Sequence, residues 1–134
     1  MRIEHLGLWT NRLEELRAFY VRYFGARPGA PYRNPRRGFE SCFLSFDSGA
    51  RLELMRMPEV ADPPRALDRE VAGYQHVALA VGSEAEVEAL TARLRADGHP
   101  VLSGPRRTGD GYYESVVLDP DRNRVEITGP PIND

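Results

Sequence analysis

The same order of elements is encoded twice in this chain, and this internal repeat limits the fold more than any other feature of the sequence. Three pairs of segments align: 3–8 with 74–79, 39–41 with 113–115, and 51–54 with 124–127. The repeat spacing is about 70 residues, enough for one small unit of strands and a helix. Because neither half is large enough to bury its own apolar face, we expect the two halves to pack against each other.

Hydrophobic patterning assigns the strands of each half. Alternating apolar residues and turn residues predict strands at 3–10, 39–46, 51–57, 74–81, 101–103, 112–118 and 124–128, with a short strand or loop at 29–34. Each half also contains one stretch of apolar residues at helical spacing that ends near a glycine. Asn11 with Glu14 and Ser83 with Glu86 have the spacing of capping boxes at the two helix starts.

Two of the three histidines and two glutamates stand at equivalent positions of the repeat. His5 aligns with His76 and Glu53 with Glu126, and the two His-to-Glu separations are 48 and 50 residues. Apolar neighbours flank these four residues, so strand alternation places the four ionisable side chains together on the opposite face. A divalent cation would offset the cost of gathering them, and two imidazoles with two carboxylates suit Zn, Ni, Co, Mn or Fe. An internal ion-pair network is the alternative interpretation.

The predicted fold class is therefore α+β, with two tandem βαβββ units forming a curved mixed sheet around a metal cleft and helices on the outer face. We expect one domain over residues 1–134. It would consist of a first unit at 1–57, a linker at 58–73 and a second unit at 74–130.

Composition narrows the function classes. All 18 basic residues are arginine, which excludes a Schiff-base lysine and a phosphate-binding loop lysine. The net charge of −2 and the absence of a long apolar stretch argue against nucleic-acid and membrane partners. The only cysteine, Cys42, excludes an intrachain disulfide and is expected to be buried. With no signal peptide visible, these features predict a cytoplasmic protein that acts on a small molecule.

These motifs resemble those of the vicinal oxygen chelate superfamily. That superfamily includes glyoxalase I, methylmalonyl-CoA epimerase, extradiol dioxygenases, fosfomycin-resistance proteins and bleomycin-binding proteins. The resemblance covers nearly the whole chain and rests on segments 3–10, 16–25, 51–55, 73–78 and 114–127. Within the family, the resemblance is to glyoxalase I-like proteins, because His5, Glu53, His76 and Glu126 match all four of their metal-ligand positions.

The resemblance implies a metal-dependent lyase or isomerase that moves a proton on a substrate bound through two neighbouring oxygens. It assigns the proton transfer to Glu126, with Glu53 as its symmetric partner, and it implies a homodimer. Lactoylglutathione lyase activity, with glutathione as cosubstrate, is one form of this function. Two alternatives stay open: a non-catalytic protein that sequesters a toxin or antibiotic, and a metal-dependent thiol transferase or dioxygenase.

Weaker candidates concern substrate recognition and one turn. Arginines in segments that look irregular, together with a tyrosine, could bind an anionic group of the substrate, or could simply be solvated: Arg36, Arg37, Arg106, Arg107 and Tyr113. Tyr112, Tyr113 and Phe39 could line the pocket or pack in the fold. Arg122 stands where the family's Asp-Pro-Asp-Gly-Asn turn has glycine, and a left-handed backbone there would cost arginine about 1 kcal/mol.

Overall fold

A computed structural model describes residues 1–62, 69–70 and 72–131. The chain divides into two compact units, residues 1–64 and 65–134, and each is described by itself. Part of the predicted linker at 58–73, namely residues 63–68 and 71, lies outside the described residues.

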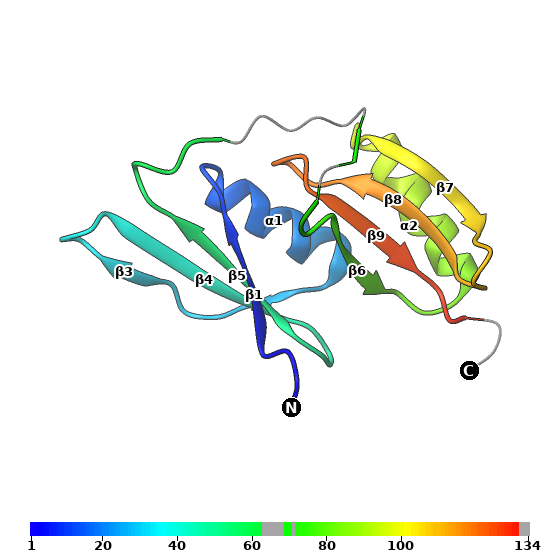
Figure 1. Ribbon diagram of the computed structural model, residues 1–134, viewed down its shortest axis with the longest axis horizontal. Coiled ribbons are helices and arrows are strands. Elements are labelled where there is room, and N and C mark those ends of the chain that lie inside the picture. Colours follow the sequence, from blue (N-terminus) through cyan, green and yellow to red (C-terminus); the bar gives the residue numbers. More distant parts are fainter. Residues whose placement is uncertain (63–68, 71, 132–134) are drawn as a thin grey trace. The chain divides into compact units, whose positions relative to one another are not determined.

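The first unit is a mixed sheet with one helix (Figure 1). Its elements are β1 (His5–Trp9), α1 (Leu13–Phe24), β2 (Arg27–Pro28), β3 (Tyr32–Asn34), β4 (Phe39–Ser45) and β5 (Arg51–Arg56). The strand order is β1-β5-β4-β2, and β3 pairs with β4. Strand β1 runs parallel to β5, and the other pairs are antiparallel.

The second unit repeats this plan (Figure 1). Its elements are β6 (His76–Ala80), α2 (Glu84–Ala96), β7 (Val101–Arg107), β8 (Tyr113–Leu118) and β9 (Arg124–Thr128). The strand order is β6-β9-β8-β7, with β6 parallel to β9. The parallel pair β6–β9 therefore corresponds to β1–β5, which confirms the α+β fold of two βαβββ units.

Each helix covers the apolar face of its own sheet. In the first unit α1 contacts β5 and β2, and Leu52 and Leu54 of β5 are fully or almost fully buried. In the second unit α2 contacts β7, β8 and β9, and Val125 and Ile127 of β9 are buried. The residues between them, Glu53 and Glu126, consequently face away from the helices, as strand alternation predicts.

Some local predictions are confirmed and others are wrong. The Ser83–Glu86 capping box forms at the start of α2, and Cys42 is buried. The box predicted at Asn11 and Glu14 does not form, because α1 begins one residue later, with Arg12 as its N-cap. Instead, the hydroxyl of Thr10 accepts a 2.9 Å hydrogen bond from the Arg12 amide.

Strand β7 is longer than the sequence pattern predicts. Residues 104–107 continue the strand predicted at 101–103, so Arg106 and Arg107 lie on a strand instead of in an irregular segment. The pattern fails here because the register of β7 on β8 is interrupted, and a glycine and a proline lie within the strand. Irregular pairing of this kind breaks the alternation from which strands are predicted.

The turn at Arg122 has the backbone that the family comparison predicts. Arg122 has φ of 63°, and it is the non-glycine residue with positive φ in the described part of the chain. The side chain of Asp119 holds the turn by accepting hydrogen bonds from the amides of Asp121 and Asn123. Neither of the two described helices is long and apolar enough to cross a membrane.

Candidate metal centre

In the first unit, the parallel strands β1 and β5 bring His5 to Glu53. The distance from His5 Nε2 to Glu53 Oε2 is 3.7 Å. The Glu53 side chain is 18% exposed, and the His5 ring packs edge-on against Phe43 of β4 at 5.3 Å between centroids. We call this pair the first half-site.

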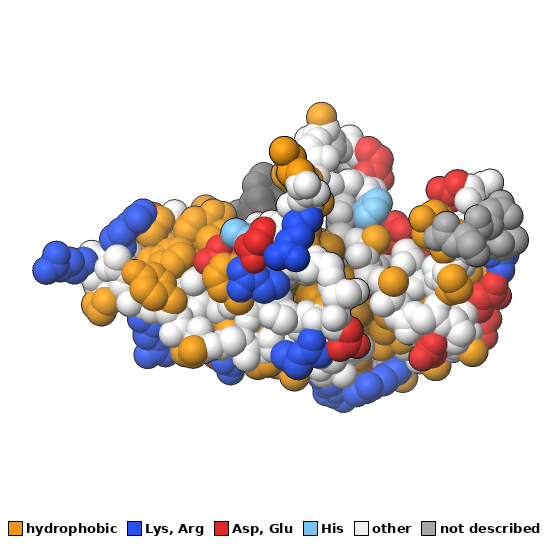
Figure 2. Space-filling view, turned by 90° about the horizontal axis from the view of Figure 1, so that it is seen from below, with side chains coloured by type: hydrophobic (Ala, Val, Ile, Leu, Met, Phe, Trp, Pro, Cys, Tyr) orange, Lys and Arg blue, Asp and Glu red, His pale blue; other side chains and the backbone are white. Residues whose placement is uncertain are grey.

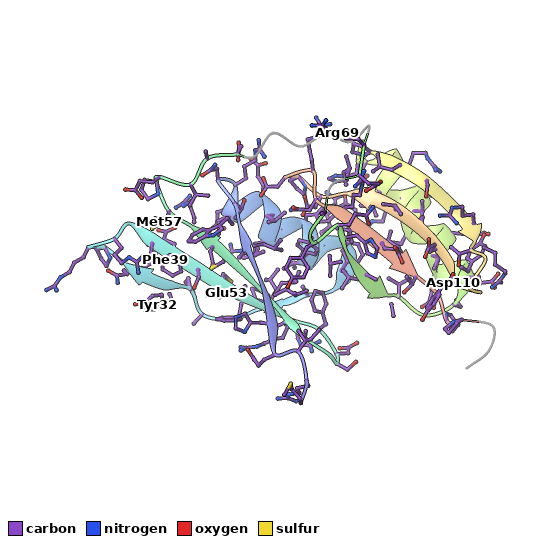
Figure 3. All side chains as sticks on the ribbon, in the orientation of Figure 1. Tyr32, Phe39, Glu53, Met57, Arg69 and Asp110 are labelled. Atoms are coloured by element: carbon purple, nitrogen blue, oxygen red, sulfur yellow. The ribbon has the colours of Figure 1, made fainter. Side chains whose placement is uncertain are left out.

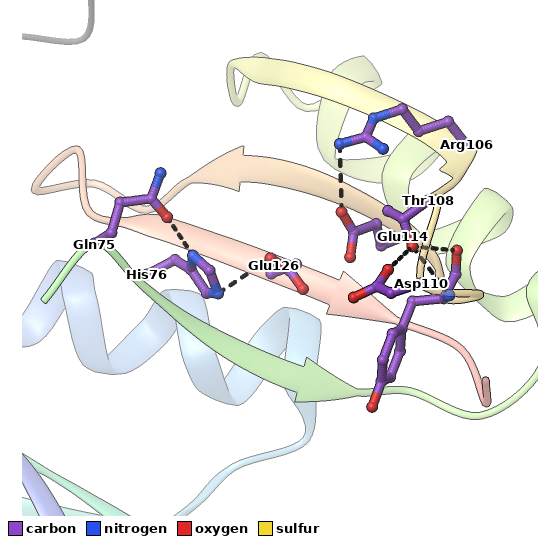
Figure 4. A network of polar contacts seen from close by, with 8 residues as sticks. Gln75, His76, Arg106, Thr108, Asp110, Glu114 and Glu126 are labelled. Carbon is purple, nitrogen blue, oxygen red and sulfur yellow. Dashed lines mark hydrogen bonds and ion pairs between the residues drawn. The ribbon is translucent and has the colours of Figure 1, made fainter. Parts of the chain in front are cut away.

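The second unit builds the same pair on the equivalent strands. His76 of β6 places Nε2 3.2 Å from Oε2 of Glu126 on β9 (Figure 4). The Glu126 side chain is 15% exposed, close to the value for Glu53. We call this pair the second half-site. Within each unit, the histidine and the glutamate at the repeat-equivalent positions are therefore in contact with each other.

The other ring nitrogen of each histidine is held by the residue that precedes it. Nδ1 of His5 bonds to the carboxylate of Glu4, and Nδ1 of His76 bonds to the amide oxygen of Gln75. Both partners are acceptors, so Nδ1 is the donor in both contacts, and Nε2 is the ring nitrogen that faces the glutamate. Metal-binding histidines are oriented in the same way by hydrogen bonds to their second nitrogen.

These preceding residues are fixed in turn by equivalent arginines. Arg51 Nε donates a 2.9 Å hydrogen bond to Glu4, and hydrogen bonds from His5 and then Arg51 lower the pKa of Glu4. In the second unit the connection passes through Glu70, which accepts bonds from Gln75 at 3.1 Å and from Arg124 at 3.0 Å. The first histidine thus has a carboxylate behind it and the second an amide.

The separation of the donor atoms fits two ligands of one ion. Ligands about 2.1 Å from an ion and about 90° to 110° apart lie about 3.0–3.4 Å from each other. The distance in the second half-site, 3.2 Å, lies within this range, and the distance in the first, 3.7 Å, is slightly longer. Within either unit, no third His, Cys, Asp or Glu of the described residues completes a group of three. Each half-site alone therefore supplies two ligands, fewer than the three or four protein ligands typical of zinc sites.

Glu114 is a site residue that the sequence analysis missed. It lies on β8, is buried, and has Arg106 Nη2 3.4 Å from its Oε1 (Figure 4). Burial raises the pKa of Glu114 to about 7; the hydrogen bond with Glu126 and the charge of Glu126 act in the same direction, while Arg106 opposes them. The available signal was its alignment with Glu40 in the repeat, together with strand register: Val116 pairs with Glu126, and Glu114 is two residues from Val116 on the same face.

The residues predicted to bind substrate are distributed over both faces of their sheets. Arg107 pairs with Glu84, and Tyr113 donates a 2.7 Å hydrogen bond to Glu88, both on α2, so these two side chains lie on the helix side. The hydrogen bond to Glu88 raises the pKa of Tyr113. Arg106 instead lies with Glu114 on the side of the second half-site. Arg37 lines a pocket of the first unit, whereas Arg36 is not among its lining residues.

A duplicated α+β fold with one His–Glu pair per unit defines a class of proteins built from paired βαβββ modules. The family model of the Glyoxalase/Bleomycin resistance protein/Dioxygenase superfamily matches residues 2–127. The chain belongs to this superfamily, which confirms the resemblance drawn from its motifs.

Solved structures share the fold. A lactoylglutathione lyase from Agrobacterium tumefaciens has a TM-score of 0.66 at 25% identity, with 95% of this chain and 92% of that chain covered. The trypanothione-dependent glyoxalase I of Leishmania major has a TM-score of 0.75 at 22% identity, covering 96% and 86% of the two chains. A glyoxalase family protein from Bacillus cereus reaches a TM-score of 0.79 at 14% identity, covering 96% and 93%. The last two likenesses concern the fold alone.

One curated relative is similar over part of its length. The uncharacterized protein YqjT of Bacillus subtilis (strain 168) is 38% identical over 61 residues. The alignment spans 43% of this chain and 48% of the relative, so the chain covers about half of that protein.

Proposed function

We propose that this protein is a metal-dependent, glyoxalase-like lyase or isomerase. The observation that supports this most is the pair of equivalent half-sites, each with an imidazole Nε2 directed at a carboxylate oxygen, at 3.7 Å and 3.2 Å. In both half-sites Nδ1 is held by an acceptor and Nε2 faces the carboxylate, which is the orientation in which an imidazole binds a metal through Nε2. The lactoylglutathione lyase of Agrobacterium tumefaciens, at 25% identity, is consistent with this class of activity.

In this proposal His5, Glu53, His76 and Glu126 hold one divalent ion, which is Ni, Zn, Co, Mn or Fe. Two ligands per half-site are too few on their own, so the two half-sites share the ion, contributed by one chain or by two chains of a homodimer. Arg51 with Glu4 and Arg124 with Glu70 keep the imidazoles oriented for this role.

When bound, the ion would supply the polarisation of a substrate carbonyl. Glu126 then removes the proton from the hydroxyl-bearing carbon next to that carbonyl and delivers it to the carbonyl carbon, while the hydroxyl proton passes to the former carbonyl oxygen, so that hydroxyl and carbonyl exchange places. Glu114 lies beside Glu126 and bonds to it in its protonated form, so it withdraws one acceptor oxygen of Glu126 and orients the other. Glu53 is the symmetric counterpart of Glu126.

Metal binding is the first test. The purified protein should bind one ion per four-ligand site, measured by elemental analysis and by thermal shift with each of the five metals. His5→Ala and His76→Ala should each weaken binding at least tenfold, and His99→Ala, which removes the third histidine, is the matched control. Unchanged affinity in both half-site variants would refute the proposed ligands.

Activity is the second test. Glutathione with methylglyoxal, assayed in the presence of each metal, tests whether the reaction is that of a lactoylglutathione lyase. On any substrate that is turned over, Glu126→Gln should lower kcat by a factor of about 100 to 10,000 while most of the metal affinity stays. Metal binding without turnover of any tested substrate would favour another chemistry of the superfamily. The absence of both metal binding and turnover would favour sequestration.

The expected homodimer and cytoplasmic location are part of this proposal. Light scattering gives the oligomeric state directly. Mixing inactive His5→Ala and His76→Ala chains then tests the sharing of ligands, because a dimer with exchanged half-sites regains one intact site. Fractionation of cells that produce the protein tests the location.

A further inference from the structure

The first unit contains a pocket of about 320 Å³ that the half-sites do not explain. Its walls are formed by three aromatic rings, two methionines and two polar side chains: Trp9, Tyr32, Phe39, Met55, Met57, Asn34 and Arg37. We call it the aromatic pocket. Its volume is at the lower end of the range for small-molecule sites, enough for one ring and a short chain.

The rings stand around Phe39 and leave apolar surface open to solvent. Trp9 is edge-on to Phe39 at 6.0 Å, and Tyr32 is tilted against it at 6.1 Å. Trp9 is nonetheless 44% exposed and Tyr32 57% exposed. The space-filling view shows hydrophobic side chains gathered beside basic ones over β3 and β4 (Figure 2). Aromatic surface of this kind, left open beside a cation, is typical of a binding site.

The aromatic pocket lies on the same face of the sheet as the first half-site. Trp9 is four residues from His5 on β1, so both side chains point to one face, and Met55 and Met57 follow Glu53 at alternate positions. Figure 3 labels Glu53 together with Tyr32, Phe39 and Met57 of the pocket. Gly7 lies between His5 and Trp9, and a Cβ there would stand 2.9 Å from the Met55 methyl carbon. Glycine therefore leaves room for Met55 to connect the half-site to the pocket.

The guanidinium of Arg37 gives the pocket its charge preference. Other arginines of this unit pair with carboxylates, for example Arg33 and Arg56 with Glu40. In the part of the chain that the structure describes, no ion pair of Arg37 is present. An unpaired guanidinium beside exposed rings fits a ligand that has an apolar ring and an anionic group.

We propose that the aromatic pocket binds the ring-bearing, carboxylate-bearing part of the substrate. That this ligand is a substrate rests on the proposed metal-dependent function. Strand geometry sets the length of that molecule. At about 3.3 Å per residue, Met55 is about 7 Å from Glu53 along β5, and Met57, the residue after β5, is about 13 Å from it. The substrate thus carries its two metal-binding oxygens about 7 to 13 Å from an aromatic group. A flexible polar tripeptide such as glutathione does not supply that ring.

Trp9 is the only tryptophan of the chain, so its fluorescence reports directly on the pocket. The probe is 4-phenylbutyrate, compared with 4-phenylbutan-1-ol, which lacks the charge, and butyrate, which lacks the ring. We expect 4-phenylbutyrate to shift or quench the Trp9 emission with a millimolar dissociation constant. The alcohol should bind roughly threefold more weakly, and butyrate should cause no change.

Arg37→Gln should abolish the preference for 4-phenylbutyrate over the alcohol. Arg33→Gln is the matched control, because Arg33 lies between Tyr32 and Asn34 on the same strand, is paired with Glu40, and is not a pocket residue. Phe39→Ala should weaken the binding of both ring-bearing probes roughly tenfold. The comparison of probes on the unmodified protein stands even if this last variant folds poorly.

The outcomes separate this inference from the proposed function. Probe binding with no metal binding would leave the pocket in place and refute the enzyme, whereas metal binding with no response of Trp9 to the probe would overturn the pocket. Equal response to 4-phenylbutyrate and the alcohol would refute the role of Arg37. If the Trp9 emission shifts from that of a buried to that of an exposed tryptophan when a dimer is diluted to monomer, a second copy of the chain occupies the pocket. That result also overturns the inference.

Discussion

Substitution of Glu114 by glutamine should change how the stability of the metal-free protein depends on pH. Burial and the neighbouring Glu126 raise the pKa of Glu114 from 4.5 to about 7. Between these values the folded state holds a proton that the unfolded state has released. The free energy of unfolding therefore falls as the pH rises through this window. Glutamine resembles the protonated acid, so Glu114→Gln should remove that loss.

The structure sets the size of the effect. Each unit of pKa shift corresponds to 1.36 kcal/mol, so the full shift of Glu114 would contribute about 3 kcal/mol between pH 4 and pH 8. The Glu114 side chain is 11% exposed and 3.4 Å from the Arg106 guanidinium. Solvent and this cation both reduce the penalty of ionisation, and we therefore expect a difference of about 1 to 2 kcal/mol.

Urea unfolding in the presence of a chelator, at pH 5 and at pH 8, measures this difference. The matched control is Glu40→Gln, since Glu40 is the repeat equivalent of Glu114 but lies between the guanidinium groups of Arg33 and Arg56. The control should retain the decline in stability toward pH 8, and Glu114→Gln should lose it. Parallel pH profiles for the wild type and Glu114→Gln would refute the assignment of a buried, protonated carboxyl to this position.

Three further predictions concern the second unit. Gln75→Leu should weaken metal affinity about 10- to 100-fold by isothermal titration, because it removes the acceptor that holds Nδ1 of His76. Arg122→Gly should raise the free energy of unfolding by about 0.5 to 1 kcal/mol in chemical denaturation, since φ of 63° favours glycine, and a loss of stability would contradict the strain. Ser83→Ala should lower the melting temperature, because Ser83 accepts the Glu86 amide at the N-cap of α2, and an unchanged value would exclude a contribution from this cap.

Much of the fold follows from the repeat and the strand pattern, because both depend on local chemistry. Alternation predicts that Glu53 and Glu126 face away from the buried leucine, valine and isoleucine residues beside them, and they do. Strand β9 has the predicted bounds, Arg124–Thr128. The predictions fail where tertiary pairing overrides local pattern. Strand β7 continues past an interior glycine and proline because it stays paired with β8, although the register of that pairing shifts.

The candidate site was predictable in part. Repeat alignment finds His5, Glu53, His76 and Glu126 because the same chemistry recurs at the same strand positions. It does not find Glu114, since its burial and its contact with Arg106 depend on which strands lie side by side. The aromatic pocket is likewise assembled from four strands and a turn, and of its lining residues only Arg37 and Phe39 were candidates from the sequence.

Duplication makes the two half-sites equivalent in ligands, but their surroundings differ in charge, and this difference supports Glu126 over Glu53 as the base. In the first unit the carboxylate at the repeat position of Glu114 is Glu40, which Arg33 and Arg56 neutralise. In the second unit Glu114 bonds to Glu126 itself, and its one cationic neighbour in the described structure, Arg106, is at 3.4 Å. A second carboxyl beside a carboxylate makes it costlier to keep both ionised, so a proton taken from substrate is more readily accommodated in the second unit. Proton transfer should therefore depend on the second unit, and substrate binding should depend on the aromatic pocket of the first unit.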